Sequence, residues 1–320
     1  MKHYLSLLLA LFNIRLPLTF RPDYCSISNA GSNAKSQPYY CTAFHQWLRL
    51  LLSLVICVFY NGCSTVPYEQ QVAENNSANL QTVSGDPFIH KVYVNEAAFS
   101  AQVNDTKHRF LHVYIGGDGR PYANGKATQN PTPSNPLLLK LMAKDKQPSI
   151  YIGRPCYFNP SDIQCNQAWW TIRRYNEQIV DSLLSALSHY SSRYEYITLI
   201  GYSGGGALAM LMAEKLSKAR LLVTIAGNLD IFEWTTHHEY TPLMDSVNPA
   251  ELPPLRHNII QIHYAGKDDK KIRAEWIKDV VDKQRQAEFH LIEGADHSCC
   301  WAKLWPDVLM KIQSYQSFIK

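Results

Sequence analysis

Hydrophobic and polar residues follow two periods along this chain, one typical of strands and one typical of helices. Short apolar runs bounded by turn residues predict strands at 88–94, 98–103, 110–115, 148–153, 196–201, 221–227, 258–266 and 288–294. Apolar residues at helical spacing predict helices at 179–187, 204–219 and 272–281. Pro306 is expected to open a last helix.

Strands that alternate with helices in this way are typical of βαβ units. The sequence therefore predicts an α/β fold with a mainly parallel central sheet and helices on both faces. Residues 87–320 are expected to form this domain. Ligands of such sheets bind beyond the carboxyl ends of the strands, and the candidate functional residues all follow predicted strands.

The segment Gly201-Tyr202-Ser203-Gly204-Gly205 has the pattern GxSxG and joins the strand at 196–201 to the helix at 204–219. A strand that turns into a helix this sharply strains the serine backbone and needs neighbours without bulky side chains. The Ser203 hydroxyl is then exposed above a helix N-terminus, where the helix dipole favours a developing oxyanion. This pattern predicts a nucleophile at Ser203, with Tyr202 beside the substrate.

Two further residue types are needed to activate a serine, an imidazole that accepts its proton and a carboxylate that orients the imidazole. His297 follows the last predicted strand, and Asp269 follows the strand at 258–266. Their order after Ser203 is the order of the nucleophile-elbow hydrolases. Asp268 and Asp230 remain alternatives for the acid.

An oxyanion needs N–H donors from two places, the residue after the nucleophile and the loop after an early strand. Gly204 fills the first position, and the glycine-rich segment VYIGGDGRP at 113–121 fills the second. The backbone N–H groups of Asp118 and Gly204 are therefore predicted to form the oxyanion hole.

Over residues 87–320 the chain resembles the α/β-hydrolase superfamily. Its segments VYIGGDG, NPTPSNP, GRPCYF, AWWTIRRYNEQIV and GYSGGG resemble a bacterial, often lipid-anchored group of this superfamily, although Gly116 stands where that group has an acidic residue. The resemblance implies an α/β-hydrolase fold with a short cap after the sixth strand, and a serine hydrolase that needs no cofactor or metal.

The predicted cap covers about residues 228–256 and is rich in aromatic side chains. Trp234 and His238 are candidates for contact with substrate or for packing of the cap on the body. Since the cap is short, we expect a small-molecule acyl substrate, whether ester, thioester or amide.

Two other function classes are compatible with parts of the sequence. A lipid-anchored binding protein can keep the fold without the chemistry. Gly204, Gly206 and Ala209 also spell GxGxxA after a strand, with Asp230 after the next one, which is a weak dinucleotide-binding pattern. That pattern leaves Asp269 and His297 without a role.

The charge of the chain argues against one class of partner. It has 31 Lys and Arg against 27 Asp and Glu, without a long run of like charges. This balance gives no basic surface for nucleic acid, so no nucleic-acid partner is expected.

The N-terminal region predicts a targeting segment. Residues 1–62 are expected to be a leader whose apolar run at 50–60 suits a signal peptide, with a translation start that the sequence leaves open. Cys63 after Gly62 resembles the lipidated cysteine of bacterial lipoproteins, and residues 63–86 are expected to be a flexible tether. This resemblance implies a periplasm-facing lipoprotein of the bacterial envelope, sorted to the outer membrane, with a membrane as partner.

Four cysteines fall in the predicted domain: Cys156, Cys165, Cys299 and Cys300. An envelope compartment permits disulfides, and Cys156 with Cys165 is the favoured pair among three possible connectivities. No ligand spacing for zinc accompanies these cysteines, so no metal site is expected.

Overall fold

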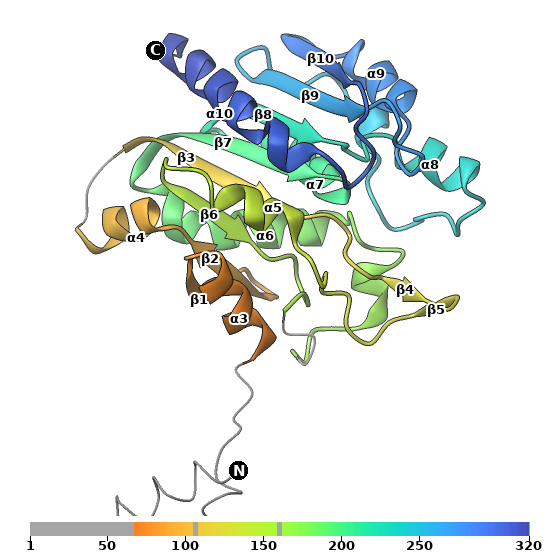
Figure 1. Ribbon diagram of the computed structural model, residues 1–320. Coiled ribbons are helices and arrows are strands. Elements are labelled where there is room, and N and C mark those ends of the chain that lie inside the picture. Colours follow the sequence, from red (N-terminus) through yellow and green to blue (C-terminus); the bar gives the residue numbers. More distant parts are fainter. Residues whose placement is uncertain (1–66, 105–107, 159–161, 320) are drawn as a thin grey trace, which may run out of the picture. The chain divides into compact units, whose positions relative to one another are not determined.

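The computed structural model describes residues 67–104, 108–158 and 162–319. Within this part, eight strands form one sheet in the order β1-β2-β6-β3-β7-β8-β9-β10 (Figure 1). From β6 to β10 all neighbours are parallel, whereas β2 is antiparallel to β1 and to β6. The strands are β1 (Asn79–Ser84), β2 (Ile89–Val94), β3 (His108–Ile115), β6 (Ser149–Ile152), β7 (Tyr194–Tyr202), β8 (Ala219–Ile225), β9 (Ile260–Gly266) and β10 (Ala287–Ile292).

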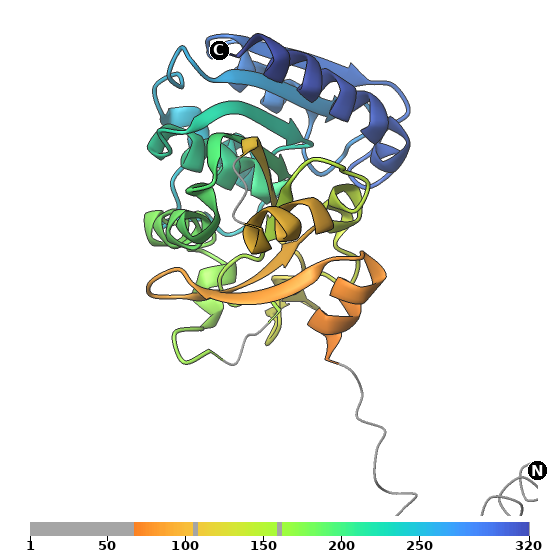
Figure 2. The same ribbon diagram turned by 90° about the vertical axis from the view of Figure 1, so that its left-hand side faces the viewer.

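Helices cover both faces of this sheet, so the predicted mainly parallel, doubly covered sheet is confirmed. The helices are α3 (Tyr68–Asn75), α4 (Glu96–Val103), α5 (Leu137–Met142), α6 (Glu177–Ser191), α7 (Gly204–Lys215), α8 (Ile231–His237), α9 (Ala274–Val281) and α10 (Trp301–Phe318). Apolar residues of α6, α7 and α9 pack in one core and those of α5 and α10 in another. Figures 1 and 2 show α10 and α6 on opposite sides of the sheet.

The strands separate these two cores because successive side chains point to opposite faces. In β3, Leu111 and Val113 belong to the core under α6 and α7, and Tyr114 belongs to the core under α5 and α10. All three side chains are fully buried. A strand that is apolar on both faces is typical of a covered parallel sheet.

The segment predicted as a cap connects β8 to β9. It contains α8 and the short 3₁₀ helix η2 (Pro249–Glu251). Asn248 joins the two ends of this segment, because its Oδ1 accepts from the Ile231 N–H at 3.0 Å. Ile231 and Leu243 are buried in the core under α6 and α7, so the segment is anchored on the body of the domain.

The run at 98–103, predicted as a strand, is instead the helix α4. The Asn95 side chain caps this helix by accepting from the Ala98 N–H, which a preceding asparagine does well. Ala98 and Ala101 are buried and lie on one face of the helix. Six residues, two of them alanine, are too few to distinguish helical from strand periodicity.

The last helix does not begin at Pro306 as predicted. α10 begins at Trp301 and continues through the proline. A proline inside a helix leaves the carbonyl four residues earlier without its N–H partner. Here the Lys144 ammonium donates to that carbonyl, Ala302 O, at 3.1 Å.

The predicted tether at 63–86 was also wrong from residue 68 onward. This stretch forms α3 and β1, and β1 pairs with β2 along its whole length. Val72 and Ala73 of α3 are buried, and Tyr190 of α6 donates to Gln81 of β1 at 2.8 Å. Polar edge strands lack the apolar alternation by which a sequence reveals a strand.

The predicted leader at 1–62 and the predicted lipidation site Cys63 lie outside the described residues. Within the described residues, no helix combines the length and apolarity that crossing a bilayer requires.

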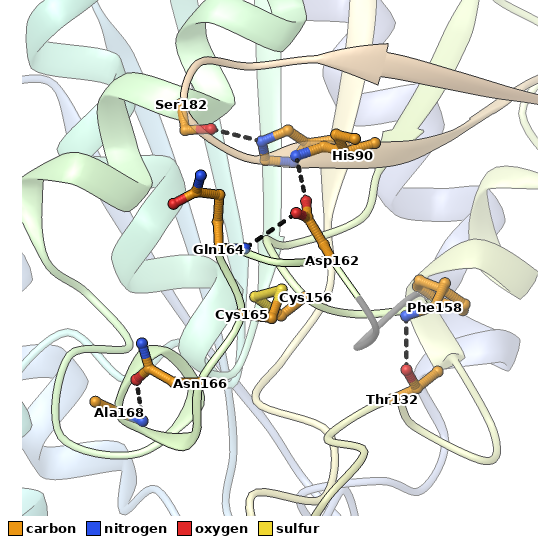
Figure 3. Close-up of a disulfide and its surroundings, with 11 residues drawn as sticks. His90, Thr132, Cys156, Phe158, Asp162, Gln164, Cys165, Asn166, Ala168 and Ser182 are labelled. Carbon is orange, nitrogen blue, oxygen red and sulfur yellow. Dashed lines mark hydrogen bonds between the residues drawn. A yellow bond between two sulfur atoms is a disulfide. The ribbon is translucent and has the colours of Figure 1, made fainter.

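Two disulfides occur in the described residues, Cys156–Cys165 and Cys299–Cys300. Figure 3 shows the first beside β2, in the loop that follows β6. Asp162 ties this loop to β2 by accepting from the Ile89 N–H at 3.2 Å. The loop therefore has both a covalent and a polar attachment.

Because two histidines are buried, we expect acid to destabilise the fold. Burial lowers the pKa of His90 to about 4 and that of His263 to about 3. In the unfolded chain a histidine has a pKa near 6.5, so between these values only the unfolded state binds the proton, and the free energy of unfolding falls as the pH falls. From pH 6.5 to 5, the loss is about 2 kcal/mol per histidine.

Urea unfolding followed by circular dichroism at several pH values between 7 and 5 measures this slope. The His263→Gln variant is expected to show a shallower slope than the wild type. An equal slope in both proteins would contradict the assignment.

Candidate active site

Ser203 lies at the sharp corner between β7 and α7. Its backbone has φ 53° and ψ −125°, a strained conformation for a residue with a side chain. The corner is held because the Ser203 N–H donates to Ile225 O at 3.0 Å. Any side chain on Gly205 would overlap the backbone of Ile115 in β3, so this position requires glycine.

The structure brings Ser203, His297 and Asp269 into one hydrogen-bonded series. Ser203 Oγ lies 3.1 Å from His297 Nε2, and His297 Nδ1 lies 2.8 Å from Asp269 Oδ2. In this series, Nδ1–H donates to the carboxylate and Nε2 accepts from the hydroxyl. Such an imidazole is oriented to take the serine proton.

The Asp269 carboxylate is fixed on its other side as well. Its Oδ1 accepts from the N–H groups of Lys271 at 2.8 Å and Ile272 at 2.9 Å, and its side chain is fully buried. The two other acids considered from the sequence lie elsewhere. Asp268 is exposed, and Asp230 caps α8 by accepting from the Phe232 N–H.

The loop of His297 is held from two directions. The Tyr202 hydroxyl donates to His297 O at 2.8 Å, and Trp301 Nε1 donates to the same carbonyl at 3.1 Å. The Tyr202 ring also lies 5.2 Å from the imidazole, centroid to centroid. Burial raises the pKa of Tyr202 to about 12, so its hydroxyl remains a donor at neutral pH.

Asp118 and Gly204 lie against each other next to Ser203. The Asp118 carboxylate occupies the space that a side chain on Gly204 would fill, and Gly117 packs against Ser203. Among the described residues, neither the Asp118 N–H nor the Gly204 N–H donates to a protein acceptor. The two residues predicted to form the oxyanion hole thus lie beside Ser203.

The Asp118 side chain has partners that the sequence did not indicate. Its Oδ1 accepts from Arg154 Nη1 at 2.5 Å, and its Oδ2 accepts from Arg174 Nη1 at 2.9 Å and from the Tyr175 hydroxyl at 2.7 Å. Burial by itself would raise the pKa of Asp118, but the charges of Arg174 and Arg154 hold it well below its ordinary value. The carboxylate is therefore ionised and fixes the loop that carries its own N–H.

We expect a large decrease in the free energy of unfolding when the carboxylate of this cluster is replaced. In Asp118→Asn, two arginines with 2% and 4% exposed side chains lose their counter-charge. Breaking a buried ion pair from one side costs about 3–5 kcal/mol. Urea unfolding measures the loss.

The control is Asp181→Asn, which removes the exposed pair of Asp181 with Lys215. Exposed pairs contribute about 0–1 kcal/mol, so this variant is expected to unfold close to the wild type. Equal losses in the two variants would contradict a structural role for the Asp118 cluster.

Ser203 opens into a pocket of about 760 Å³. The predicted substrate residues Tyr202, Trp234 and His238 all line it. His238 Nε2 lies 2.9 Å from Lys271 O, and the Arg174 Cζ lies 5.7 Å from the centre of the Trp234 ring, so both residues also pack the cap against its surroundings. The volume suits a medium-sized organic molecule.

Asn228, the third residue after β8, was missed from the sequence. Its N–H donates to Ser203 O at 2.9 Å, and its side chain lines the pocket. The buried Oδ1 of this amide has no hydrogen-bond partner among the described residues. The sequence offered one signal for Asn228: it follows the end of a predicted strand and stands two positions before Asp230.

Across residues 67–104, 108–158 and 162–319, no group of His, Cys, Asp or Glu side chains is arranged to hold an ion.

Comparison with solved structures gives the fold. Est1E from Butyrivibrio proteoclasticus is similar with a TM-score of 0.53 and 10% identity, covering 74% of this chain and 98% of that one. Alpha/beta hydrolase domain-containing protein 10 from mouse is similar with a TM-score of 0.53 and 13% identity, covering 76% and 100%. The fold is that of the α/β-hydrolases. Pyrococcus furiosus esterase Pf2001 is also similar, with a TM-score of 0.52, 9% identity and coverage of 77% and 95%.

No protein-family model matches the sequence, and comparison with curated proteins finds no match either.

The α/β-hydrolase fold explains how distant residues meet. In chain order, Ser203 follows the fifth strand of the sheet, Asp269 the seventh and His297 the eighth. The three strands β7, β9 and β10 are parallel, so their carboxyl ends lie at the same edge. Loops at that edge converge on one pocket.

Proposed function

We propose that the chain is a serine hydrolase that cleaves an ester, thioester or amide through an acyl-enzyme. The observation that carries this proposal is the series Ser203–His297–Asp269, with distances of 3.1 Å and 2.8 Å, at the wall of a pocket. The similar structures support the fold alone, so the activity is argued from these side chains.

In the proposed first step, Ser203 Oγ attacks the substrate carbonyl carbon while its proton passes to His297 Nε2. The negative charge that develops on the carbonyl oxygen is stabilised by the N–H groups of Asp118 and Gly204. Asp269 stabilises the imidazolium and holds its orientation. His297 then protonates the leaving group, which departs and leaves an acyl group on Ser203.

In the proposed second step, a water molecule takes the place of the leaving group. His297 accepts a proton from the water, whose oxygen attacks the acyl carbon. The same N–H groups stabilise the second oxyanion. Ser203 recovers its proton from His297, and the carboxylic acid leaves.

The dinucleotide-binding alternative fits the structure less well. A pyrophosphate would need the N-terminus of α7, where the ionised Asp118 carboxylate lies over Gly204. Like charges at this distance repel. No observation favours a non-catalytic binding protein over a hydrolase.

We also propose that Cys63 carries a lipid and attaches the enzyme to a bacterial envelope membrane. The support is the sequence around Gly62 and Cys63 after an apolar run. Mass spectrometry of the N-terminal peptide from cells that express the wild type or Cys63→Ser tests this. An unmodified wild-type peptide would exclude the anchor.

Labelling of the full chain with a fluorophosphonate tests the hydrolase. An activated serine attacks this probe and keeps a phosphonyl group, which peptide mapping then locates. We expect a single modified peptide that contains Ser203. A folded chain that stays unlabelled, or a label on another serine, would refute the proposal.

A further inference from the structure

The pocket in front of Ser203 has more cationic than anionic side chains. Arg120, Arg174 and Lys271 line it, against the carboxylates of Asp118 and Glu239. Asp118 is already shared by Arg154 and Arg174, so these three residues together carry one net positive charge. The pocket therefore presents an excess of positive charge to a ligand.

Arg174 is the buried member of this set. Its Nε donates to Thr171 O at 2.7 Å and its Nη1 to Asp118 at 2.9 Å. Its Nη2 donates to no acceptor in the described part of the chain, and the residue lines the pocket. The guanidinium is held in place, since its Cζ also lies 5.7 Å from the centre of the Trp234 ring.

Arg120 and Lys271 lie at the exposed rim, where neither forms an ion pair with a described residue. Glu239 is the acidic residue of the rim. Two rim cations against one rim anion attract a negatively charged ligand toward the pocket. A buried arginine with an open donor then supplies a fixed partner.

From these contacts we propose that the substrate carries a carboxylate besides its scissile acyl bond, and that Arg174 binds this carboxylate. The inference rests on the proposed hydrolase function. A monoanion matches the single net charge of the Asp118–Arg154–Arg174 group, whereas a phosphate dianion exceeds it. Arg174 thus selects the substrate, and Ser203 cleaves it.

The test uses pairs of substrates that differ only in this charge. Mono-4-nitrophenyl esters of dicarboxylic acids of increasing length are compared with their methyl esters, in which the free carboxylate is blocked. A second arm compares 4-acetoxybenzoate, which has the carboxylate on the leaving group, with its methyl ester. A third arm uses 4-acetoxyphenyl phosphate.

We expect the free carboxylate to raise kcat/KM about tenfold or more in the first or second arm, mainly through KM. In Arg174→Gln this preference is expected to disappear. Because Arg174 also pairs with Asp118, that variant can fail to fold. The exposed Lys271→Gln is then compared with Lys270→Gln, whose side chain is outside the pocket lining. A reduced preference in Lys271→Gln alone supports the inference.

Equal or faster turnover of the methyl esters in both arms would overturn the carboxylate site, and so would a preference confined to the phosphate. Fluorophosphonate labelling of Ser203 in the same preparation distinguishes failure of the carboxylate site from failure of the hydrolase proposal. A labelled wild type without charge preference refutes the carboxylate site and leaves the hydrolase standing. An unlabelled wild type refutes both.

Discussion

The Ser203→Ala variant is expected to lose about a factor of 10⁶ in kcat on any ester that the wild type hydrolyses. The reason is that the Ser203 hydroxyl, 3.1 Å from His297 Nε2, is the group that forms the acyl-enzyme in the proposed mechanism. His297→Ala is expected to lose a similar factor, because the serine then has no base. Initial rates with 4-nitrophenyl butyrate measure both.

The double variant Ser203→Ala/His297→Ala tests whether the two residues act together in one mechanism. Residues that act as one unit give losses that do not add, so the double variant is expected to match either single variant. A further drop in the double variant, or more than about 1% residual activity in Ser203→Ala, would contradict the acyl-enzyme mechanism.

The second large effect is expected for Asp269→Asn, with kcat lowered about 10⁴-fold. An asparagine amide at this position can donate to His297 Nδ1 and so favour the wrong tautomer, which leaves Nε2 protonated and unable to accept from Ser203. The wild-type carboxylate accepts at 2.8 Å and accepts two further backbone N–H bonds, so its position is fixed. Raising the pH is expected to rescue only part of the loss.

Asp268→Asn and Asp230→Asn are the matched controls, because the sequence offers the same side chain at both positions. Asp268 is exposed, and Asp230 contacts the first turn of α8. Both variants are expected to keep the wild-type kcat, and Asp230→Asn is expected to keep the helix cap, because an asparagine Oδ1 accepts the same backbone N–H groups. A loss of activity in either control that equals the loss in Asp269→Asn would assign the acid differently.

Local features of the sequence determined the architecture of the domain and the positions of Ser203 and His297, and left three candidates for the acid. Buried parallel strands are apolar on both faces, so β3, β7, β8 and β9 could be recognised one at a time. The glycines around Ser203 showed a sharp corner because no other residue fits there. His297 and a candidate acid could be placed beside Ser203 because all parallel strands end at one edge.

Elements with weak local signals were decided by packing. β1 at the edge of the sheet is polar, and its strand conformation depends on pairing with β2. Residues 98–103 are helical because Asn95 caps them and two alanines pack inward. α10 extends back to Trp301 because Lys144, which is 158 residues from Ala302 in sequence, satisfies the carbonyl that Pro306 leaves open.

The sequence by itself thus determined the parallel part of the sheet, the corner at Ser203 and the chain order of the serine, aspartate and histidine, because each depends on a periodicity or on neighbouring residues. The tertiary structure alone decided which aspartate contacts His297, since Asp268 and Asp269 differ by one position but only one of them is buried. It also decided that Arg154 and Arg174 meet Asp118, 36 and 56 residues away in sequence. Pairs of charges so far apart leave no local pattern, because their interaction depends on burial that only the folded chain provides.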